Sequence, residues 1–290
     1  MAGMIRRAVL GTGLVAAAGL LVWRWTSPGV TEVAYGPGPR QVLDVTLPAG
    51  AGPFPILMLI HGGAFQSGDK SDLTIPAGVL EAGIAVVRVN YRLSGTDPWP
   101  AQARDCLAAV VHLQREGAAL GLDPSRLVLM GQSAGAFLAV STALSLVEVG
   151  LAPRGVISFF GPMDFSTMDA DMAALGRTPL MGPTDAADSP ESRLLGFTVA
   201  EDRAAARAMG PVGRLEVLRE PLPPILIRHG DADPLIADLQ AKRLQAAWSA
   251  ADPTAEVDFA LVPGAGHGGA EFETGPVQEA TLAFLRRVLA

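Results

Sequence analysis

The pentapeptide GQSAG at residues 131–135 places Ser133 between two glycines, and this is the first feature that could perform chemistry. A serine hydroxyl becomes a nucleophile on a sharp strand-to-helix turn where a neighbouring base accepts its proton. The apolar run 126–130 precedes the motif and an alanine-rich run follows it, as such a turn requires. Because the chain holds 33 glycines, the pattern also arises by chance in sequences of this composition. The motif therefore needs support from a base, an acid and oxyanion donors.

The base must come from one of four histidines. His61 ends an apolar run before a glycine turn, His112 lies in a helical pattern, and His229 ends another apolar run. His267 lies in the glycine-flanked loop VPGAGHGGAEF after the last apolar run. Only His267 combines an exposed loop with a position downstream of Ser133, so we predict that it is the base.

The acid that orients the imidazole is expected in HGDADPLI, at 229–236, which supplies Asp231 and Asp233. The order serine, aspartate, histidine along the chain is one that catalytic triads use. The pattern leaves the choice between the two aspartates open. The other one is expected to cap the turn or the next helix.

Backbone N–H donors for a developing oxyanion are expected in the segment IHGGAF, at 60–65. Gly62 and Gly63 let the backbone approach a substrate closely, and Ala134 starts the helix after the serine. Each such donor is worth roughly 2.7–4 kcal/mol to the transition state. We predict that these three residues form an oxyanion hole. The alternative is a loop that needs glycine only to turn.

The elements that must position these residues alternate between apolar runs and helical patterns. Strands are expected at 31–35, 41–47, 55–60, 84–89, 126–130, 155–160, 224–229 and 255–262, and helices at 72–82, 101–117, 134–148, 235–249 and 276–288. Most of the strands are continuously apolar, which is typical of a parallel sheet buried on both faces. The sequence predicts an α/β fold with a doubly wound, mostly parallel sheet of about eight strands, two antiparallel ones at the front, and helices on both faces.

The residues from about 164 to 213 interrupt this alternation without a strand signal and are too many for a simple connection. We predict a small helical cap insertion. Five of the nine methionines lie in it or at its edge: Met163, Met168, Met172, Met181 and Met209. Such flexible side chains suit either a pocket for varied apolar groups or an irregular helical layer, and the sequence favours neither.

Composition argues against several other classes of function. The net charge of −7 and the absence of a basic run argue against nucleic-acid binding. The histidines are scattered, without H-x-x-x-H spacing, so we expect no metal and no cofactor. Cys106 is the single cysteine and lies in an apolar helical pattern, where we expect a buried side chain and no intrachain disulfide.

The N-terminal segment has a different composition from the rest. Residues 8–23 carry no charge and follow two arginines, as in an export signal. They span about 24 Å as a helix, against the roughly 30 Å of a bilayer core. Trp23 ends this run and Trp25 follows it, as interfacial aromatics do at the end of a span, and there is no convincing cleavage site. We expect residues 1–28 to be a signal-anchor, with a cleaved signal or a helix packed on the domain as alternatives. Residues 29–290 would then be a catalytic domain at the periplasmic or extracytoplasmic face of a bacterial inner membrane.

Taken together, these motifs resemble the α/β-hydrolase esterases of the acetyl-esterase and hormone-sensitive-lipase type, and most closely the BD-FAE-like subgroup. The resemblance covers about residues 33–288 and rests on HGGAF, GDK, VNYRLS, DPSRLVLMGQSAGAFLA, HGDADPLI and PGAGHG. The resemblance implies the α/β-hydrolase fold. It also implies that Asp233 is the acid of the triad and that Gly62 and Gly63 are the glycines of the oxyanion hole.

Two positions depart from this pattern. Ala64 replaces the third glycine of the HGGG form, which puts activity on esters of bulky tertiary alcohols in doubt. Gly210 precedes proline where the family usually has serine, and we expect only a structural effect.

The function implied is a metal-independent carboxylesterase for small, acetyl-type esters that forms an acyl-enzyme on Ser133. The fold and the triad also fit an amide or formamide hydrolase, such as a kynurenine-formamidase-like enzyme or a peptidase. A binding protein that kept the fold without turnover is a further alternative, against which the intact triad argues. The expected partner is a small ester, with membrane contact through the N-terminal segment, and the sequence leaves the oligomeric state open.

Overall fold

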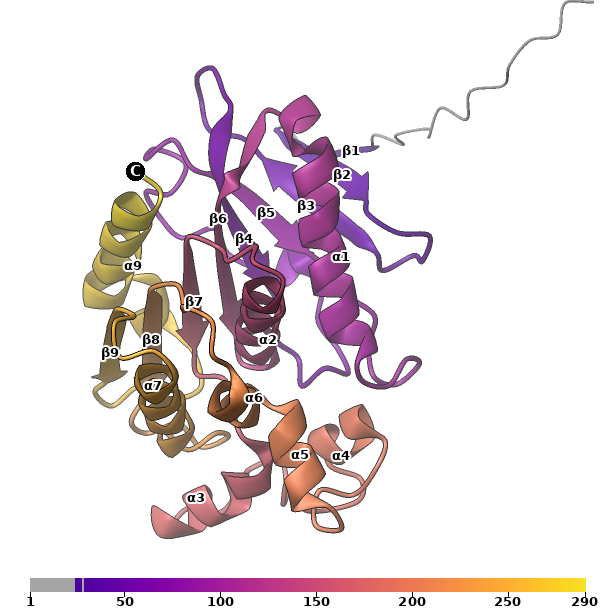
Figure 1. The fold of residues 1–290 in the computed structure, drawn as a ribbon, viewed down its shortest axis with the longest axis vertical. Coiled ribbons are helices and arrows are strands. Elements are labelled where there is room, and N and C mark those ends of the chain that lie inside the picture. Colours follow the sequence, from indigo (N-terminus) through magenta and orange to yellow (C-terminus); the bar gives the residue numbers. More distant parts are fainter. Residues whose placement is uncertain (1–23, 28) are drawn as a thin grey trace, which may run out of the picture.

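A sheet of nine strands organises the residues that the computed structural model describes, which are 24–27 and 29–290 (Figure 1). The strands are Arg24–Ser27 (β1), Val30–Ala34 (β2), Val42–Thr46 (β3), Phe54–Ile60 (β4), Ala85–Val89 (β5), Leu122–Gln132 (β6), Gly155–Phe159 (β7), Ile225–Gly230 (β8) and Val257–Val262 (β9). Their order across the sheet is β1-β2-β3-β5-β4-β6-β7-β8-β9. The pairings from β1 to β5 are antiparallel, and every pairing from β5 to β9 is parallel.

The continuously apolar strands are buried on both faces because helices cover both sides of the sheet. Alternate residues of β4 point to opposite sides, so Ile56 and Met58 join one core and Leu57 joins the other. The first core includes helices α1 (Ala101–Glu116), α2 (Ala134–Glu148) and α7 (Leu239–Ala251). The second includes α8 (Ala270–Glu273) and α9 (Gly275–Val288). The predicted α/β-hydrolase fold is therefore confirmed.

The predicted helical insertion lies between β7 and β8. It contains α3 (Met168–Ala174), α4 (Pro190–Leu195), α5 (Arg203–Met209) and the start of α6 (Pro211–Val217), after the short 3₁₀ turn Phe165–Thr167. Figure 1 shows α3, α4 and α5 grouped beyond the end of the sheet at which α2 begins. The insertion thus lies over the carboxyl edge of the parallel strands.

One expected helix is absent from this part of the chain, and one strand is additional. The helix expected at 72–82 is wrong: this segment holds the end of the 3₁₀ turn Lys70–Asp72, an extended stretch and turns. Pro76 has no N–H to continue a helix, and Gly78 adopts a φ of 82°. The sheet also has one strand more than expected, because residues 24–27 pair with β2.

The anchor expectation concerns residues that the structure mostly does not describe, since 1–23 and 28 lie outside the described ranges. Within the described ranges, no helix is both long and apolar enough to cross a bilayer.

Candidate active site

Ser133 occupies the turn between β6 and α2 with a φ of 54° and a ψ of −126°. A positive φ is unusual for a residue other than glycine and is typical of strained functional turns. A Cβ atom on Gly131 would lie 2.0 Å from the carbonyl oxygen of Gly135, and one on Gly135 would lie 2.1 Å from that of Ile60. Both glycines of the motif are therefore required where β4, β6 and α2 meet.

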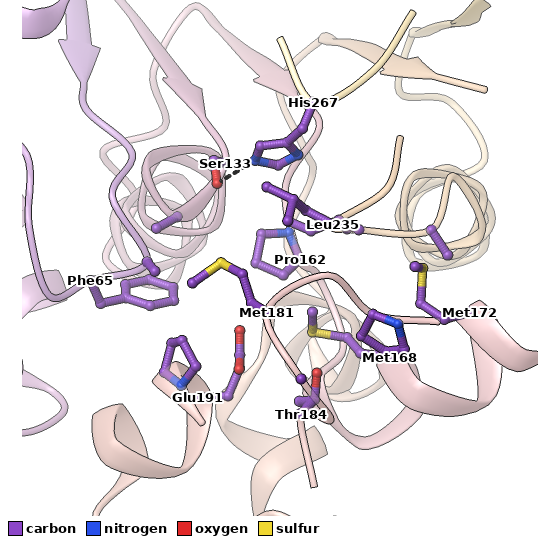
Figure 2. Close-up of a pocket in the computed structure, with 17 residues that line it drawn as sticks. Phe65, Ser133, Pro162, Met168, Met172, Met181, Thr184, Glu191, Leu235 and His267 are labelled. Carbon is purple, nitrogen blue, oxygen red and sulfur yellow. Dashed lines mark hydrogen bonds between the residues drawn. The ribbon is translucent and has the colours of Figure 1, made fainter. Parts of the chain in front are cut away.

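His267 and Asp233 approach Ser133 from separate loops. The serine Oγ lies 2.8 Å from Nε2 of His267 (Figure 2). Nδ1 of the same ring lies 2.7 Å from Oδ2 of Asp233. A proton on Nδ1 is donated to the carboxylate, which leaves Nε2 to accept from the serine hydroxyl. The three residues follow β6, β8 and β9, so the carboxyl ends of parallel strands bring them together.

Four donors hold the carboxylate of Asp233, which is fully buried. Its Oδ1 accepts from the backbone amides of Leu235 at 2.8 Å and Ile236 at 3.0 Å. Its Oδ2 lies 3.3 Å from Nε2 of His229, in addition to the bond from His267. Burial acts to raise the pKa of Asp233, but the hydrogen bonds from both histidines and Ile236 outweigh it and hold the pKa well below its usual value. The group therefore stays an anion throughout the neutral range.

Two residues of this arrangement escape prediction from the sequence. His229 is completely buried, and its Nε2 also donates to the carbonyl oxygen of Ile236 at 3.0 Å. Its i, i+4 spacing to Asp233 within one tight turn is a signal that could have found it. Phe160 presents its ring edge-on to His267 with 4.8 Å between ring centres, and no local sequence pattern marks it.

Two of the predicted oxyanion residues, Gly62 and Ala134, lie beside the serine, and Gly63 follows Gly62 in the loop. A Cβ on Gly62 would lie 3.2 Å from the Cβ of Ser133, so this backbone passes directly beside the hydroxyl. Gly63 turns the loop with a φ of 106°. The N–H groups of Gly62, Gly63 and Ala134 donate to no other group within the described part of the chain. Within the described residues, Gly62 and Ala134 thus offer unused N–H groups beside the serine, and Gly63 offers a third at the next position of the loop.

A buried polar network supports this loop from behind. Nδ1 of His61 lies 2.7 Å from the carbonyl oxygen of Gly62, and Nε2 lies 3.3 Å from the Arg40 guanidinium. Arg40 also donates to the carbonyl oxygens of Gly68 and Tyr91, and the Tyr91 ring stacks on His61. Burial, with the charge of Arg40, lowers the pKa of His61 despite its bond to Gly62. A neutral imidazole thus donates through Nδ1 and fixes the loop.

Asp231, the other aspartate that the sequence offered, has a structural contact. Its Oδ1 accepts from the amide of Gly264 at 2.7 Å and ties the acid loop to the turn after β9. Arg177, from the insertion, donates to the carbonyl oxygens of both Asp231 and Asp233. The insertion is therefore hydrogen-bonded to the loop that carries Asp233.

A cavity joins the serine to the insertion. It encloses about 620 Å³, its open mouth included, and Figure 2 shows Ser133 and His267 on the side opposite Glu191. The methionines divide between both roles left open by the sequence: Met168, Met172 and Met181 line the cavity, whereas Met163 is fully buried in the core.

Elsewhere, Cys106 is buried as expected. Among the described residues, no three His, Cys, Asp or Glu side chains form a group that could hold a metal.

Comparison with known proteins places this geometry in a family context. A family model described as BD-FAE matches residues 43–248. Esterase LipQ of Mycobacterium tuberculosis is 27% identical over 253 residues, which cover 82% of this chain and 56% of LipQ. The chain therefore spans about half the length of this relative.

Two solved structures share the fold. A bacterial heroin esterase superposes with a TM-score of 0.72 at 26% identity, covering 90% of this chain and 85% of its own. A truncated carbohydrate esterase from gut microbiota superposes with a TM-score of 0.75 at 24% identity, covering 89% and 95%, and shows likeness of fold alone.

Proposed function

The chain belongs to the BD-FAE family, with the α/β-hydrolase fold, and from this premise we propose that it is a serine carboxylesterase for small acyl esters. The observation that carries the proposal is the hydrogen-bonded series from Asp233 through His267 to Ser133, with distances of 2.7 and 2.8 Å. The esterase names of LipQ and of the heroin esterase support the same reaction class.

The reaction proceeds by two acyl transfers. Ser133 Oγ attacks the ester carbonyl while Nε2 of His267 accepts its proton. Asp233 holds the ring and stabilises the imidazolium, and the same nitrogen then gives the proton to the departing alcohol. Water, activated by His267, attacks the acyl-serine in the second half, which releases the acid and restores the hydroxyl.

The negative charge that forms on the carbonyl oxygen is stabilised by the free N–H groups of Gly62, Gly63 and Ala134. These donors are held before the reaction begins, by the Arg40–His61 network on one side and by the start of α2 on the other. Preorganised donors of this kind require no rearrangement as charge develops.

Small acyl groups are favoured by the walls beside the serine. Phe65 lines the cavity, is buried, and packs edge-on against Phe137 and Phe165, so it is a rigid wall. We expect acetyl esters to be hydrolysed with a higher kcat/KM than octanoyl esters, because a long chain would have to displace this wall.

The test is labelling of the full chain with a fluorophosphonate, together with hydrolysis of p-nitrophenyl acetate. We expect label on Ser133, and a kcat for Ser133→Ala lower by roughly four to six orders of magnitude. Turnover of anilides at a rate equal to that of the matched esters would favour an amidase instead. Absence of both labelling and hydrolysis in a folded protein would overturn the proposal.

A further inference from the structure

One carboxyl group stands apart in the cavity that joins Ser133 to the insertion. Glu191 lies in the first turn of α4, is 9% exposed, and lines the cavity. Figure 2 shows its carboxyl group directed into the cavity, across from Ser133 and His267. The walls between them are mainly apolar, from Phe65, the cavity methionines, Leu235 and prolines.

No cation within the described residues pairs with this carboxyl group. The arginines around the insertion pair with other acids, among them Asp164, Asp171 and Asp185. The charge that adds to burial in raising its pKa is the carboxylate of Asp169, which the amides of Thr184 and Asp185 hold in place. The insertion side of the cavity therefore carries a carboxyl group whose charged form a cationic ligand would stabilise.

A purely structural role at the start of α4 does not account for Glu191. Ser189 already caps this helix: its Oγ accepts from the amide of Ser192 at 3.0 Å and donates to the carbonyl of Thr184 at 2.7 Å. Burial and the charge of Asp169 raise the pKa of Glu191 to about 7, even though its own amide lowers it. A carboxylate kept to stabilise a helix start would show the opposite direction.

We propose that Glu191 is a specificity residue, and that the preferred ester carries a cationic amine on the part that enters the insertion. This inference rests on the proposed esterase function. The apolar lining from Phe65, Met168 and Met172 suits the methyl groups of a substituted ammonium ion. A sugar would need many donors and acceptors, whereas the insertion side offers only Thr184 and Glu191 among the described lining residues.

The experiment compares esters that differ only in charge, using the full chain. Dimethylaminoethyl acetate is paired with isopentyl acetate, and ethyl dimethylaminobutanoate with its carbon isostere, so that the cation is tested on either side of the ester. In the wild type, kcat/KM favours the amine in at least one pair by roughly 10- to 100-fold, the range expected for a hydrogen bond to a charged group. Glu191→Gln loses this preference, so its ratio of kcat/KM for the amine to kcat/KM for the neutral partner falls toward one.

The matched control is Glu116→Gln, which removes the same charge from an exposed site before β6, at the opposite edge of the sheet from Ser133. It keeps the preference. Calorimetry with dimethylaminoethyl acetate on Ser133→Ala, and on Ser133→Ala with Glu191→Gln, measures binding without turnover and should show weaker binding in the second.

The outcomes separate the two proposals. Hydrolysis of the neutral esters with no amine preference in either pair would refute the cationic site and leave the esterase standing. A preference that Glu191→Gln retains would also refute the site. If no ester is hydrolysed and Ser133 is not labelled, the esterase proposal fails, and calorimetry alone decides whether Glu191 binds a cation.

Discussion

Replacement of Glu191 by glutamine should stabilise the fold at neutral and alkaline pH. The carboxyl group titrates at about 7 in the folded chain, against an ordinary value of 4.5, because burial and Asp169 disfavour its charge. Below the ordinary value both states hold the proton, and stability is unaffected. As the pH rises toward 7 the unfolded chain ionises first, so the folded state loses stability. The two pKa values differ by about 2.5, and a difference of one corresponds to about 1.36 kcal/mol. The folded state is therefore destabilised by roughly 3 kcal/mol above pH 7.

The assay is thermal unfolding of the wild type, Glu191→Gln and Glu116→Gln at pH 5 and pH 8. For a chain of this size 1 kcal/mol shifts Tm by about 2–4 °C, so we expect Glu191→Gln to melt roughly 6–12 °C higher than wild type at pH 8. The gain should shrink to less than about a third at pH 5, where most of the linkage is absent. Glu116→Gln should match the wild type at both. A Glu191→Gln variant that melts lower than wild type at pH 8 would show that the carboxylate stabilises the fold, and would refute this reasoning.

Three further predictions concern the groups around Ser133. Asp233→Asn should lower kcat for p-nitrophenyl acetate by roughly 10,000-fold, because the imidazole loses its oriented tautomer. Asp231→Asn should keep most of the activity, since an amide oxygen still accepts from Gly264. The reverse ranking would assign the acid to Asp231. Gly135→Ala should fail to accumulate as folded protein, because its methyl group would meet the Ile60 carbonyl at 2.1 Å; a normal melting curve would contradict this. Arg40→Gln should lower kcat roughly 10- to 100-fold with little change in KM, through displaced oxyanion donors, and an unchanged kcat would show that the loop holds without it.

The parts that the sequence predicted are those that a local pattern specifies. Apolar continuity marked the parallel strands, since each must be buried on both faces, and this fixed which edge of the sheet carries the loops. Ser133 and His267 then followed from their places after strands. No helix forms at 72–82, because Pro76 lacks an N–H and Gly78 adopts a positive φ, and both interrupt helical hydrogen bonding.

The insertion could not be predicted beyond its existence. Its helices α3, α4 and α5 span six or seven residues each, too few to show a hydrophobic period. Glu191 therefore looks like any acid near a helix start. Only the three-dimensional arrangement shows that it faces an apolar cavity opposite the serine.

One set of hydrogen bonds explains two differences between the sequence prediction and the structure. It distinguishes Asp233 from Asp231 as the acid, and it accounts for a start of α7 later than predicted. The helix expected from residue 235 begins at Leu239. The amides of Leu235 and Ile236 converge on the carboxylate of Asp233, while the carbonyl of Ile236, which a helix would offer to the amide of residue 240, accepts from His229. Two backbone amides and His229 thus fix the orientation of the Asp233 carboxylate. Its Oδ2 can then accept the hydrogen bond from His267 in a defined direction. Asp231, whose single bond goes to Gly264, has no such setting. The residues before α7 are thus used to bind the carboxylate of Asp233 and the ring of His229. Helical periodicity in the sequence indicates neither the later start of α7 nor the role of Asp233.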